Sequence, residues 1–506
     1  MDLTNEKSID TKESEIKFGT DGWRAIISQD FNFNNLIKVS IAIANFIKSN
    51  QRKELDIYKI DYTKHKDASY KVNYRDYSYG VAIGYDFRFM SEIYAKKVAE
   101  ILSAFDIPVY LSEYNCSTPA LSLATYKNYS AGIMITASHN PYYYNGVKYK
   151  AEYGGSSTPE MTKLIESYLK DIPNEFNNLK PKHNLIKKIN FNKTYLNELL
   201  NFIDIEKIKD YVIKNNIIIV VDYMYGVLAN SFRYLLNLEN LIELNNNRNP
   251  YFGGKSPEPI PANLKELENV INMIGDNSIG FAFDGDGDRI FAKTKDSWLT
   301  PHEILPILAL HLIKNKNWDG KLIRTLPTST KLKRIGDYFN IETIEVPVGF
   351  KYIADLFVKE NILIGGEESG GIGFKNHIPE RDSLLNALFI LEFLAYENLK
   401  PNELINYLHK FTKESYCYRY DWHFENIEQQ QNTFNKIKNN LDLFKNILDG
   451  EIEIKDYIRI KKDDYNWIIL RPSGTEPLIR VYSESITYNQ AQNLINSLLN
   501  KFNIKN

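Results

Sequence analysis

The stretch YGVAIGYDFRFMSEIYAKKVAEILSAFDIPVYLSEYNCSTPALSLATYKNYSAGIMIT, residues 79–136, contains two alternating kinds of pattern. Short apolar runs that are typical of strands alternate with segments that have the apolar spacing of helices. In chain order these segments are 79–88, 91–105, 108–112, 118–127 and 131–136. Strands that alternate with helices of this length indicate βαβ units. The stretch therefore predicts an α/β fold with a largely parallel sheet.

The same order of elements recurs further along the chain, although without a close sequence repeat. A second pass runs from 217 to 288 and a third from 301 to 398. The last hundred residues differ, because 439–485 has the pattern of short antiparallel strands and 489–502 that of a helix. We therefore expect three α/β units followed by one α+β module.

The length of 506 residues is too great for one hydrophobic core and indicates three or four domains. Polar, proline-containing segments at 171–183, 295–303 and 396–403 are the candidate boundaries. The predicted domains are 1–184, 185–297, 298–405 and 406–506. We interpret residues 49–79, which are rich in Lys, Asp and Tyr, as an inserted surface loop outside the site.

The composition argues against several classes of partner. A net charge of −2 gives no electrostatic reason to expect nucleic acid or a membrane surface. The two cysteines, Cys116 and Cys417, lie far apart, which indicates a reducing compartment. The N-terminus resembles no signal peptide and no apolar stretch is long enough to span a membrane. We expect a cytoplasmic protein.

The motif FDGDGDR, 283–289, places Asp284, Asp286 and Asp288 directly after an apolar strand. Three carboxylates this close repel one another unless a cation lies among them. An EF-hand is excluded because its sixth position would be Arg289, where glycine is needed. The pattern predicts a Mg²⁺ site that leaves positions open for a phosphate oxygen. The alternative is an acidic turn without a metal.

The motif TASHNP, 136–141, contains Ser138 and His139. Adjacent residues of an extended chain point opposite ways, so we do not expect His139 to reach the hydroxyl of Ser138. The segment also lacks the G-x-S-x-G elbow of a hydrolase. A plain polar loop and a phosphorylated Ser138 beside the metal remain, with His139 positioning its neighbours. Lys148 then pairs with the phosphate or exchanges a proton with a sugar.

The segment ILIGGEESGG, 362–371, consists of a strand and a glycine-rich turn. The turn carries Glu367 and Ser369, whose side chains suit hydrogen bonding to sugar hydroxyls. A strand-to-helix connection without a ligand is the alternative.

The segment RPSGTEPLIR, 471–480, lies between two strands. Its guanidinium, hydroxyl and free amide groups suit a phosphate cradle, since hydrogen bonds to charged groups contribute roughly 1.5–3 kcal/mol each. An ordinary hairpin turn is the alternative. The cradle residues are Arg471, Ser473, Gly474, Thr475 and Arg480.

Five motifs in this order resemble the α-D-phosphohexomutase superfamily, which includes phosphoglucomutases and phosphomannomutases. They are FGTDGWRA (18–25), TASHNPYYYNGVKYK (136–150), FDGDGDR (283–289), GEESGG (366–371) and RPSGTEP (471–477). The resemblance implies four domains around a central cleft. It implies three similar α/β domains with mixed sheets and a C-terminal α+β domain of the TATA-binding-protein-like kind.

The resemblance also implies roles for residues of this chain. Ser138 matches the serine that carries the transferable phosphoryl group and contributes an oxygen to the metal. Lys148 matches the general acid/base, and Arg24 and Arg289 match arginines near the phosphoserine. The remaining matches are the Mg²⁺ ligands Asp284, Asp286 and Asp288, the sugar binders Glu367 and Ser369, and the distal phosphate site Arg471, Ser473, Gly474, Thr475 and Arg480. Arg381, in HIPERDS, is expected to help place the sugar.

The implied reaction interconverts hexose 1-phosphate and hexose 6-phosphate through a phosphoserine and a 1,6-bisphosphate, which also serves as activator. One Mg²⁺ per chain and a monomer or homodimer are expected. Gly371 stands where many phosphomannomutase and glucosamine-phosphate mutase sequences have histidine, and GEES favours glucose phosphate, with mannose phosphate an option. The alternatives are a phosphoglucosamine mutase, a glucose 1,6-bisphosphate synthase and a noncatalytic sugar-phosphate-binding protein.

Overall fold

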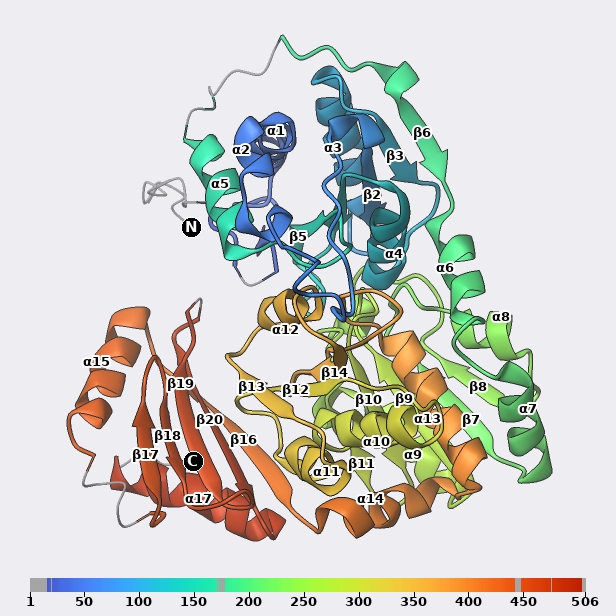
Figure 1. The fold of residues 1–506 in the computed structure, drawn as a ribbon, viewed down its shortest axis with the longest axis vertical. Coiled ribbons are helices and arrows are strands. Elements are labelled where there is room, and N and C mark those ends of the chain that lie inside the picture. The colour runs from blue at the N-terminus through green and yellow to red at the C-terminus, as the bar shows by residue number, and fades with distance from the viewer. Residues whose placement is uncertain are drawn as a thin grey trace, which may run out of the picture.

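Four β-sheets, each with helices of its own, make up this protein (Figure 1). The computed structural model describes residues 16–19, 21–170, 172, 178–441, 447–474 and 476–502. The first unit lies at the top of Figure 1, the second and third share the middle and lower part, and the fourth lies at the lower left. Within these residues, no helix is both long and apolar enough to cross a membrane.

The first sheet has six strands and is mixed. In spatial order these are β1 (Trp23–Ile26), β5 (Tyr144–Ala151), β4 (Ala131–Ile135), β2 (Val81–Tyr85), β3 (Val109–Ser112) and β6 (Ile186–Ile189). The last four run parallel, whereas β5 is antiparallel to both β4 and β1. Its helices are α1 (Phe33–Lys48), α2 (Asn50–Lys53), α3 (Ser91–Ala104), α4 (Thr118–Asn128) and α5 (Pro159–Leu169). The alternation predicted for residues 79–136 is therefore confirmed.

The strand β6 extends the first sheet beyond the expected domain boundary at residue 184. It pairs in parallel with β3, from Val109 opposite Ile186 to Ser112 opposite Ile189. In Figure 1 it runs down the right-hand edge of the first unit toward α6. The domain limits given above stay a prediction.

The second and third sheets are also mixed, each with a parallel centre and an antiparallel edge. The second has the order β11 (Trp298–Leu299), β10 (Ile290–Thr294), β9 (Ser278–Phe283), β7 (Ile218–Asp222) and β8 (Leu241–Leu244). The third has the order β13 (Thr343–Val346), β12 (Lys321–Thr325), β14 (Ile362–Gly366) and β15 (Ile372–Phe374). The functional loops leave the ends of β4, β9 and β14.

Helices cover these two sheets. Those of the second unit are α6 (Phe191–Leu199), α7 (Ile205–Lys214), α8 (Ser231–Leu236) and α9 (Lys265–Ile274). Those of the third are α10 (Pro301–Lys314), α11 (Lys331–Phe339), α12 (Phe350–Phe357), α13 (Ser383–Glu397) and α14 (Leu404–Thr412). Single 3₁₀ turns are η1 (Asp56–Tyr58), η2 (Tyr77–Tyr79), η3 (His183–Leu185), η4 (Phe252–Gly254), η5 (Pro261–Asn263) and η6 (Pro401–Glu403).

The fourth sheet is antiparallel throughout, which confirms the α+β module. Its order is β16 (Tyr416–His423), β20 (Leu478–Ser485), β19 (Trp467–Pro472), β18 (Ile458–Lys461) and β17 (Glu451–Ile454). Helices α15 (Ile427–Lys438) and α17 (Tyr488–Lys501) pack on it around a separate apolar core that includes Ile468, Val481 and Ile495. The four-unit α/β architecture is thus as expected.

The fourth unit is joined to the third through the buried carboxylate of Glu484, on β20. Both of its oxygens accept hydrogen bonds, and the side chain is fully buried. The donors are Ser329 Oγ at 2.7 Å, Arg334 Nη2 at 2.8 Å, Ser415 Oγ at 2.7 Å, the Thr330 amide at 2.9 Å and Trp467 Nε1 at 2.8 Å. We call these residues the Glu484 anchor.

The interpretation of residues 49–79 as a surface loop is only partly confirmed, because many of them are exposed but others anchor the segment inside the protein. Arg52 in this segment is fully buried and donates to Glu152 Oε2 at 2.9 Å and to the carbonyl of Ser130 at 2.6 Å. Arg75 donates to the carbonyls of Thr125 and Tyr126 near the end of α4. The polar composition did not indicate these anchors, because the two arginines bind a carboxylate and backbone carbonyls of distant segments.

The same segment straps the first unit to the third. Ser69 Oγ accepts from the amide of Ile362 at 2.7 Å and donates to its carbonyl at 2.8 Å. The Tyr70 amide donates to the carbonyl of Phe357 at 3.0 Å, and its hydroxyl donates to the carbonyl of Phe374. The strap thus fixes the start and the flank of β14, the strand that leads into the predicted sugar loop.

Candidate active site

The loop after β4 holds Ser138 in a left-handed backbone conformation, with φ at 53°. Arg88 stabilises this loop by donating to the carbonyls of Ser138 and Asn140, both at 2.6 Å. Thr136 Oγ1 accepts from the Ser138 amide at 2.8 Å and donates to Asp86 Oδ2 at 2.6 Å. Sequence reasoning missed Arg88 and Asp86, which appeared there only as the end of an apolar strand.

The aspartates of the second unit form a compact triad. Asp284, Asp286 and Asp288 are fully buried, and one oxygen from each lies within 4.8 Å of the other two. Asp284 Oδ1 accepts from the amides of Asp288 at 2.9 Å and Arg289 at 3.0 Å, so the turn folds around this side chain. Burial, followed by the like charges of the other two aspartates, raises the pKa of Asp284 well above its usual range.

The triad fits a divalent cation. Asp286 Oδ1 and Asp288 Oδ1 are buried and accept no hydrogen bond from any of the described residues. An unpaired buried carboxylate oxygen is costly unless a cation coordinates it. Hard oxygen ligands of this kind suit Mg²⁺.

The serine loop and the triad meet directly. Ser138 Oγ donates to Asp284 Oδ2 at 2.8 Å, although the two residues belong to different units. A Cβ at Gly285 would lie 2.8 Å from the Ser138 carbonyl oxygen, so this approach requires a glycine there. The expected contact between Ser138 and the loop of the aspartate triad is therefore present.

His139 is placed differently from the expectation. Its Nδ1 lies 3.3 Å from Ser138 Oγ, because the left-handed conformation at Ser138 turns both side chains to one side. The expectation that His139 does not reach the hydroxyl was therefore wrong. Burial, and then the charges of Arg289 and Arg24, lower the pKa of His139 well below its usual range. Such a weakly basic imidazole is suited to positioning rather than to proton removal.

Lys148, on β5, lies among carboxylates. Its Nζ is 2.7 Å from Asp286 Oδ2, 3.0 Å from Asp288 Oδ2 and 3.0 Å from Asp21 Oδ2. Burial alone would lower the pKa of Lys148, but Asp21 and Asp286 raise it above its usual value. Asp21 was part of a quoted motif, yet nothing in the sequence indicated its partners.

The two predicted arginines approach the same loops. Arg24, on β1, donates through Nη1 to Asn140 Oδ1 at 2.8 Å. Arg289 Nε lies 3.9 Å from Asp288 Oδ1. Both charges therefore lie close to Ser138 and can balance negative charge placed on it.

The predicted sugar loop adjoins the metal loop. The Ile290 amide donates to the carbonyl of Gly370 at 3.3 Å, directly after FDGDGDR. Glu367 is buried and Ser369 is half-buried. Burial, only partly offset by the charge of Arg381, raises the pKa of Glu367 to about 7.

Gly371 makes room for Arg381. A Cβ at position 371 would lie 2.2 Å from Arg381 Cδ, so a larger residue there would displace the arginine. Arg381 Nη2 lies 2.9 Å from Asp288 Oδ2, and Nη1 lies 3.7 Å from Glu367 Oε2. This chain has glycine where many members of the family have histidine, and the space is used by Arg381, which links the sugar loop to the triad.

The predicted phosphate cradle lies on the fourth unit, with Arg471 on β19 directly opposite Arg480 on β20. Ser473 is buried and Gly474 is exposed, whereas Thr475 lies outside the described residues. Gln430 of α15 supports the loop, because its Nε2 donates to the carbonyls of Ser473 at 3.0 Å and Leu478 at 2.7 Å.

Among the described cradle residues, no hydrogen bond or ion pair to Ser138 or the triad is found. A contact between the fourth unit and the sugar loop is the hydrogen bond from the Tyr482 hydroxyl to Glu368 Oε1, at 3.4 Å. Glu368 Oε2 also accepts from Thr325 Oγ1 at 3.0 Å. The structure thus brings the first three motifs and the predicted sugar loop together, and Tyr482 of the fourth unit contacts that loop.

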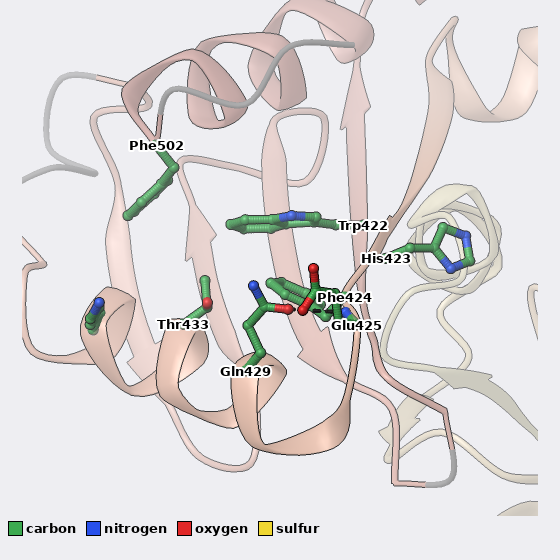
Figure 2. Close-up of a pocket in the computed structure, with 8 residues that line it drawn as sticks. Trp422, His423, Phe424, Glu425, Gln429, Thr433 and Phe502 are labelled. Carbon is green, nitrogen blue, oxygen red and sulfur yellow. Dashed lines mark hydrogen bonds between the residues drawn. The ribbon is translucent and has the colours of Figure 1, made fainter.

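A cavity of about 560 Å³ also lies on the fourth unit, next to the cradle loop, since the amide of its lining residue Phe424 donates to the carbonyl of Pro477 at 2.8 Å (Figure 2). The rings of Trp422 and Phe424 lie over one another there, with centroids 4.9 Å apart. Its lining consists of Trp422, His423, Phe424, Glu425, Gln429, Thr433, Lys436 and Phe502. None of these is a predicted site residue.

A serine loop that faces a buried carboxylate triad, with sugar and phosphate loops around it, is the arrangement of a phosphoryl-transfer enzyme. Comparison with known families gives the particular group. Models of phosphoglucomutase/phosphomannomutase α/β/α domains I, II and III match residues 69–175, 193–297 and 300–411, and that of the C-terminal domain matches 427–501. The chain belongs to this family and is a phosphohexomutase, an isomerase.

Relatives of known sequence cover much of the chain. A phosphoglucosamine/phosphogalactosamine mutase of Sulfurisphaera tokodaii is 28% identical, over 95% of this chain and 98% of that protein. A phosphoglucomutase/phosphomannomutase of Thermococcus kodakarensis is 29% identical, over 74% of this chain and 79% of that one. The fold is similar to the open form of the Paramecium phosphoglucomutase pp63/parafusin, with a TM-score of 0.78, 23% identity, and coverage of 97% and 94% of the two chains.

Proposed function

We propose that this phosphohexomutase interconverts hexose 1-phosphate and hexose 6-phosphate through a phosphoserine at Ser138 and a hexose 1,6-bisphosphate. The observation that supports this is the 2.8 Å hydrogen bond from Ser138 Oγ to Asp284, beside two carboxylate oxygens that accept no hydrogen bond from the described residues. A phosphoserine carries about −1.5 to −2 charges. Three aspartates would repel this negative charge. A divalent cation and the nearby arginines compensate it.

One Mg²⁺ would be held by Asp284, Asp286 and Asp288 together with an oxygen of the phosphorylated Ser138. When bound, it stabilises negative charge on the transferring phosphoryl group. The chain's own residues do the rest. Arg24 and Arg289 balance charge at the serine, and Lys148 exchanges a proton with the attacking or leaving sugar hydroxyl. His139 positions the hydroxyl of Ser138.

The sugar and phosphate loops position the substrate. Glu367, Ser369 and Arg381 would bind sugar hydroxyls, and the cradle from Arg471 to Arg480 would bind the phosphate that is not reacting. Phosphoryl transfer from Ser138 to a free hydroxyl of the sugar phosphate gives the 1,6-bisphosphate. This intermediate reorients in the site, and its other phosphoryl group is then transferred back to Ser138. Added hexose 1,6-bisphosphate acts as activator because it phosphorylates an empty serine.

The substrate that we propose is glucose phosphate, on the basis of the GEES loop, with mannose phosphate next. Glucosamine phosphate is the second candidate, because the S. tokodaii relative is named for amino-sugar phosphates. Steady-state comparison of glucose, mannose and glucosamine 1-phosphates separates the three. Time-resolved product analysis separates a mutase from a bisphosphate synthase, which would accumulate the bisphosphate.

The setting that we propose is the cytoplasm, with the chain acting as a monomer or homodimer. Both cysteines, Cys116 and Cys417, are free, as a reducing compartment would allow. The proposed partners are hexose phosphates alone, without nucleic acid or membrane.

Ser138→Ala tests the proposal. We expect it to abolish turnover while circular dichroism and thermal unfolding show an unchanged fold, because alanine cannot carry the phosphoryl group. Mass spectrometry of the active wild-type enzyme should find phosphate on the Ser138 peptide. The control is Ser122→Ala, a buried serine whose Oγ makes no hydrogen bond, which should keep full activity. Activity retained in Ser138→Ala would refute the assignment.

A further inference from the structure

Two cations that contact the metal triad are shared with a carboxylate outside it. Lys148 Nζ lies 3.0 Å from Asp288 Oδ2 and 3.0 Å from Asp21 Oδ2. Arg381 Nη2 lies 2.9 Å from Asp288 Oδ2 and 2.6 Å from Asp21 Oδ2. One oxygen of Asp21 and one oxygen of a triad member thus have the same two donors.

Asp21 is held firmly in this place by the backbone. The turn around it is closed by the hydrogen bond from the Gly19 amide to the Gly22 carbonyl, at 2.8 Å. Gly22 has a φ of 101°, and a Cβ there would lie 2.3 Å from the carbonyl oxygen of Val147 on β5. The turn therefore presses against the strand that carries Lys148.

Asp21 is an anion with a second set of partners. Its Oδ1 accepts from Lys150 Nζ at 3.1 Å and from Ser156 Oγ at 2.9 Å. Burial alone would raise the pKa of Asp21, but Lys148 and Lys150 hold it well below its usual range. A side chain that is 9% exposed, with two oxygens and four donors, has little freedom to move.

The arrangement bears on how the triad can hold a divalent cation. Like charges a few ångströms apart repel strongly where water is excluded. The ammonium of Lys148 and the guanidinium of Arg381 both face the triad, so they oppose a further cation there. They can remain close only if another carboxylate compensates them.

We propose that Asp21 is a positioning residue that serves as the alternative counter-ion for Lys148 and Arg381 when the triad binds a divalent cation. The inference rests on the proposed function for its assignment of Lys148 to proton exchange and Arg381 to the sugar. Asp21 holds both side chains beside the triad and compensates their positive charges. The two side chains therefore compete less with the divalent cation for the oxygens of the triad. It thereby joins the acid/base lysine of the first unit to the sugar-binding arginine of the third.

The test is the affinity of the resting protein for Mg²⁺, measured by titration calorimetry without substrate. Asp21→Asn keeps the shape of the side chain and removes its charge. Lys148 then keeps only Asp286 and Asp288 as carboxylate partners among the described residues, and competes with the metal. We expect the affinity for Mg²⁺ to fall roughly tenfold, because a loss of this size is common when a residue that orients the metal ligands is replaced. An unchanged affinity would overturn the proposal.

The matched control is Glu152→Gln. Glu152 is also a buried carboxylate of the first unit and pairs with Arg52, and within the described residues no ion pair joins it to Lys148 or Arg381. We expect its affinity for Mg²⁺ to stay within about twofold of wild type. A loss equal to that of Asp21→Asn would show a general effect of buried charge and would overturn the specific role.

A double-mutant cycle isolates the competition. In a Lys148→Met background the ammonium is absent, so Asp21→Asn should weaken Mg²⁺ binding by no more than about threefold. The full tenfold loss in that background would contradict the proposal. Should Asp21→Asn not fold, Asp21→Asn/Lys150→Met removes the buried charges as a pair and serves for the same titration.

The outcome is separable from that of the proposed function, because metal binding is measured without turnover. A wild-type protein that binds Mg²⁺ and shows the Asp21 effect, yet converts no hexose phosphate, would refute the proposed function alone. A fully active wild type whose Asp21→Asn variant binds Mg²⁺ normally would refute this inference alone. As a kinetic readout, Asp21→Asn should lower kcat more than it raises KM at saturating Mg²⁺.

Discussion

The Glu484 anchor and the aspartate triad are both built on fully buried carboxylates, yet they differ in how the carboxylate oxygens are used. In the anchor, both oxygens of Glu484 accept hydrogen bonds from the chain itself. In the triad, Asp286 and Asp288 each keep one oxygen that accepts no hydrogen bond from the described part of the chain. Since buried polar groups are almost always satisfied, the difference separates a carboxylate that joins two units from carboxylates whose oxygens suit a cation.

The largest effect that we expect comes from Asp284→Asn. The amide oxygen can still accept from the amides of Asp288 and Arg289, but the charge that faces Ser138 is lost. We expect kcat to fall about a thousandfold, which corresponds to about 4 kcal/mol of transition-state stabilisation. Thermal unfolding should show an unchanged or higher Tm, because repulsion within the triad is relieved. Activity within tenfold of wild type would contradict the functional role that distinguishes the triad from the Glu484 anchor.

The anchor should behave in the opposite way. Glu484→Gln leaves the charge of Arg334 buried without its partner, and we expect a loss of about 3 kcal/mol in the free energy of unfolding. Urea denaturation measures this loss, and the folded variant should keep its kcat. The control is Glu425→Gln, an exposed carboxylate of the same unit, for which a change within about 0.5 kcal/mol is expected. Similar values for the two variants would show that the anchor contributes little.

A smaller effect is expected from acid. Burial alone would raise the pKa of Glu484, but Arg334 and the hydroxyls of Ser415 and Ser329 lower it from the usual 4.5. A lowered pKa in the folded state means that the stabilisation is present above pH 4.5 and is lost as the pH falls below it. The difference in unfolding free energy between wild type and Glu484→Gln should therefore shrink on acidification, by about 1.4 kcal/mol for each pH unit in that window. A difference that stays constant from pH 7 to pH 3.5 would contradict this.

The sequence predicted what depends on local pattern. The alternation in residues 79–136 specifies strands and helices through apolar spacing, and the structure confirms them. The triad was predictable because three aspartates within five residues lie close together in any fold and repel one another unless a cation lies among them. Ser138 and Asp284 are 146 residues apart, and only the resemblance to a family indicated that they would meet.

The remaining features depend on contacts between distant segments. Asp21, Arg88 and Gln430 act through partners that lie far away in the chain, and no local spacing indicates those pairs. The contact of His139 with Ser138 depends on a left-handed conformation that residues other than glycine rarely adopt. Such a conformation is fixed by tertiary contacts, here with Arg88, and has no signature of its own in the sequence.

The strap formed by residues 49–79 has a consequence for protein engineering. Its composition would invite truncation as dispensable surface chain, yet Ile57, Tyr70 and Val72 belong to the apolar core of the first unit. A shortened version would uncover that core and release the backbone of β14 from Ser69. Grafting or loop-trimming schemes for this enzyme should therefore treat the segment as a fixed part of the scaffold.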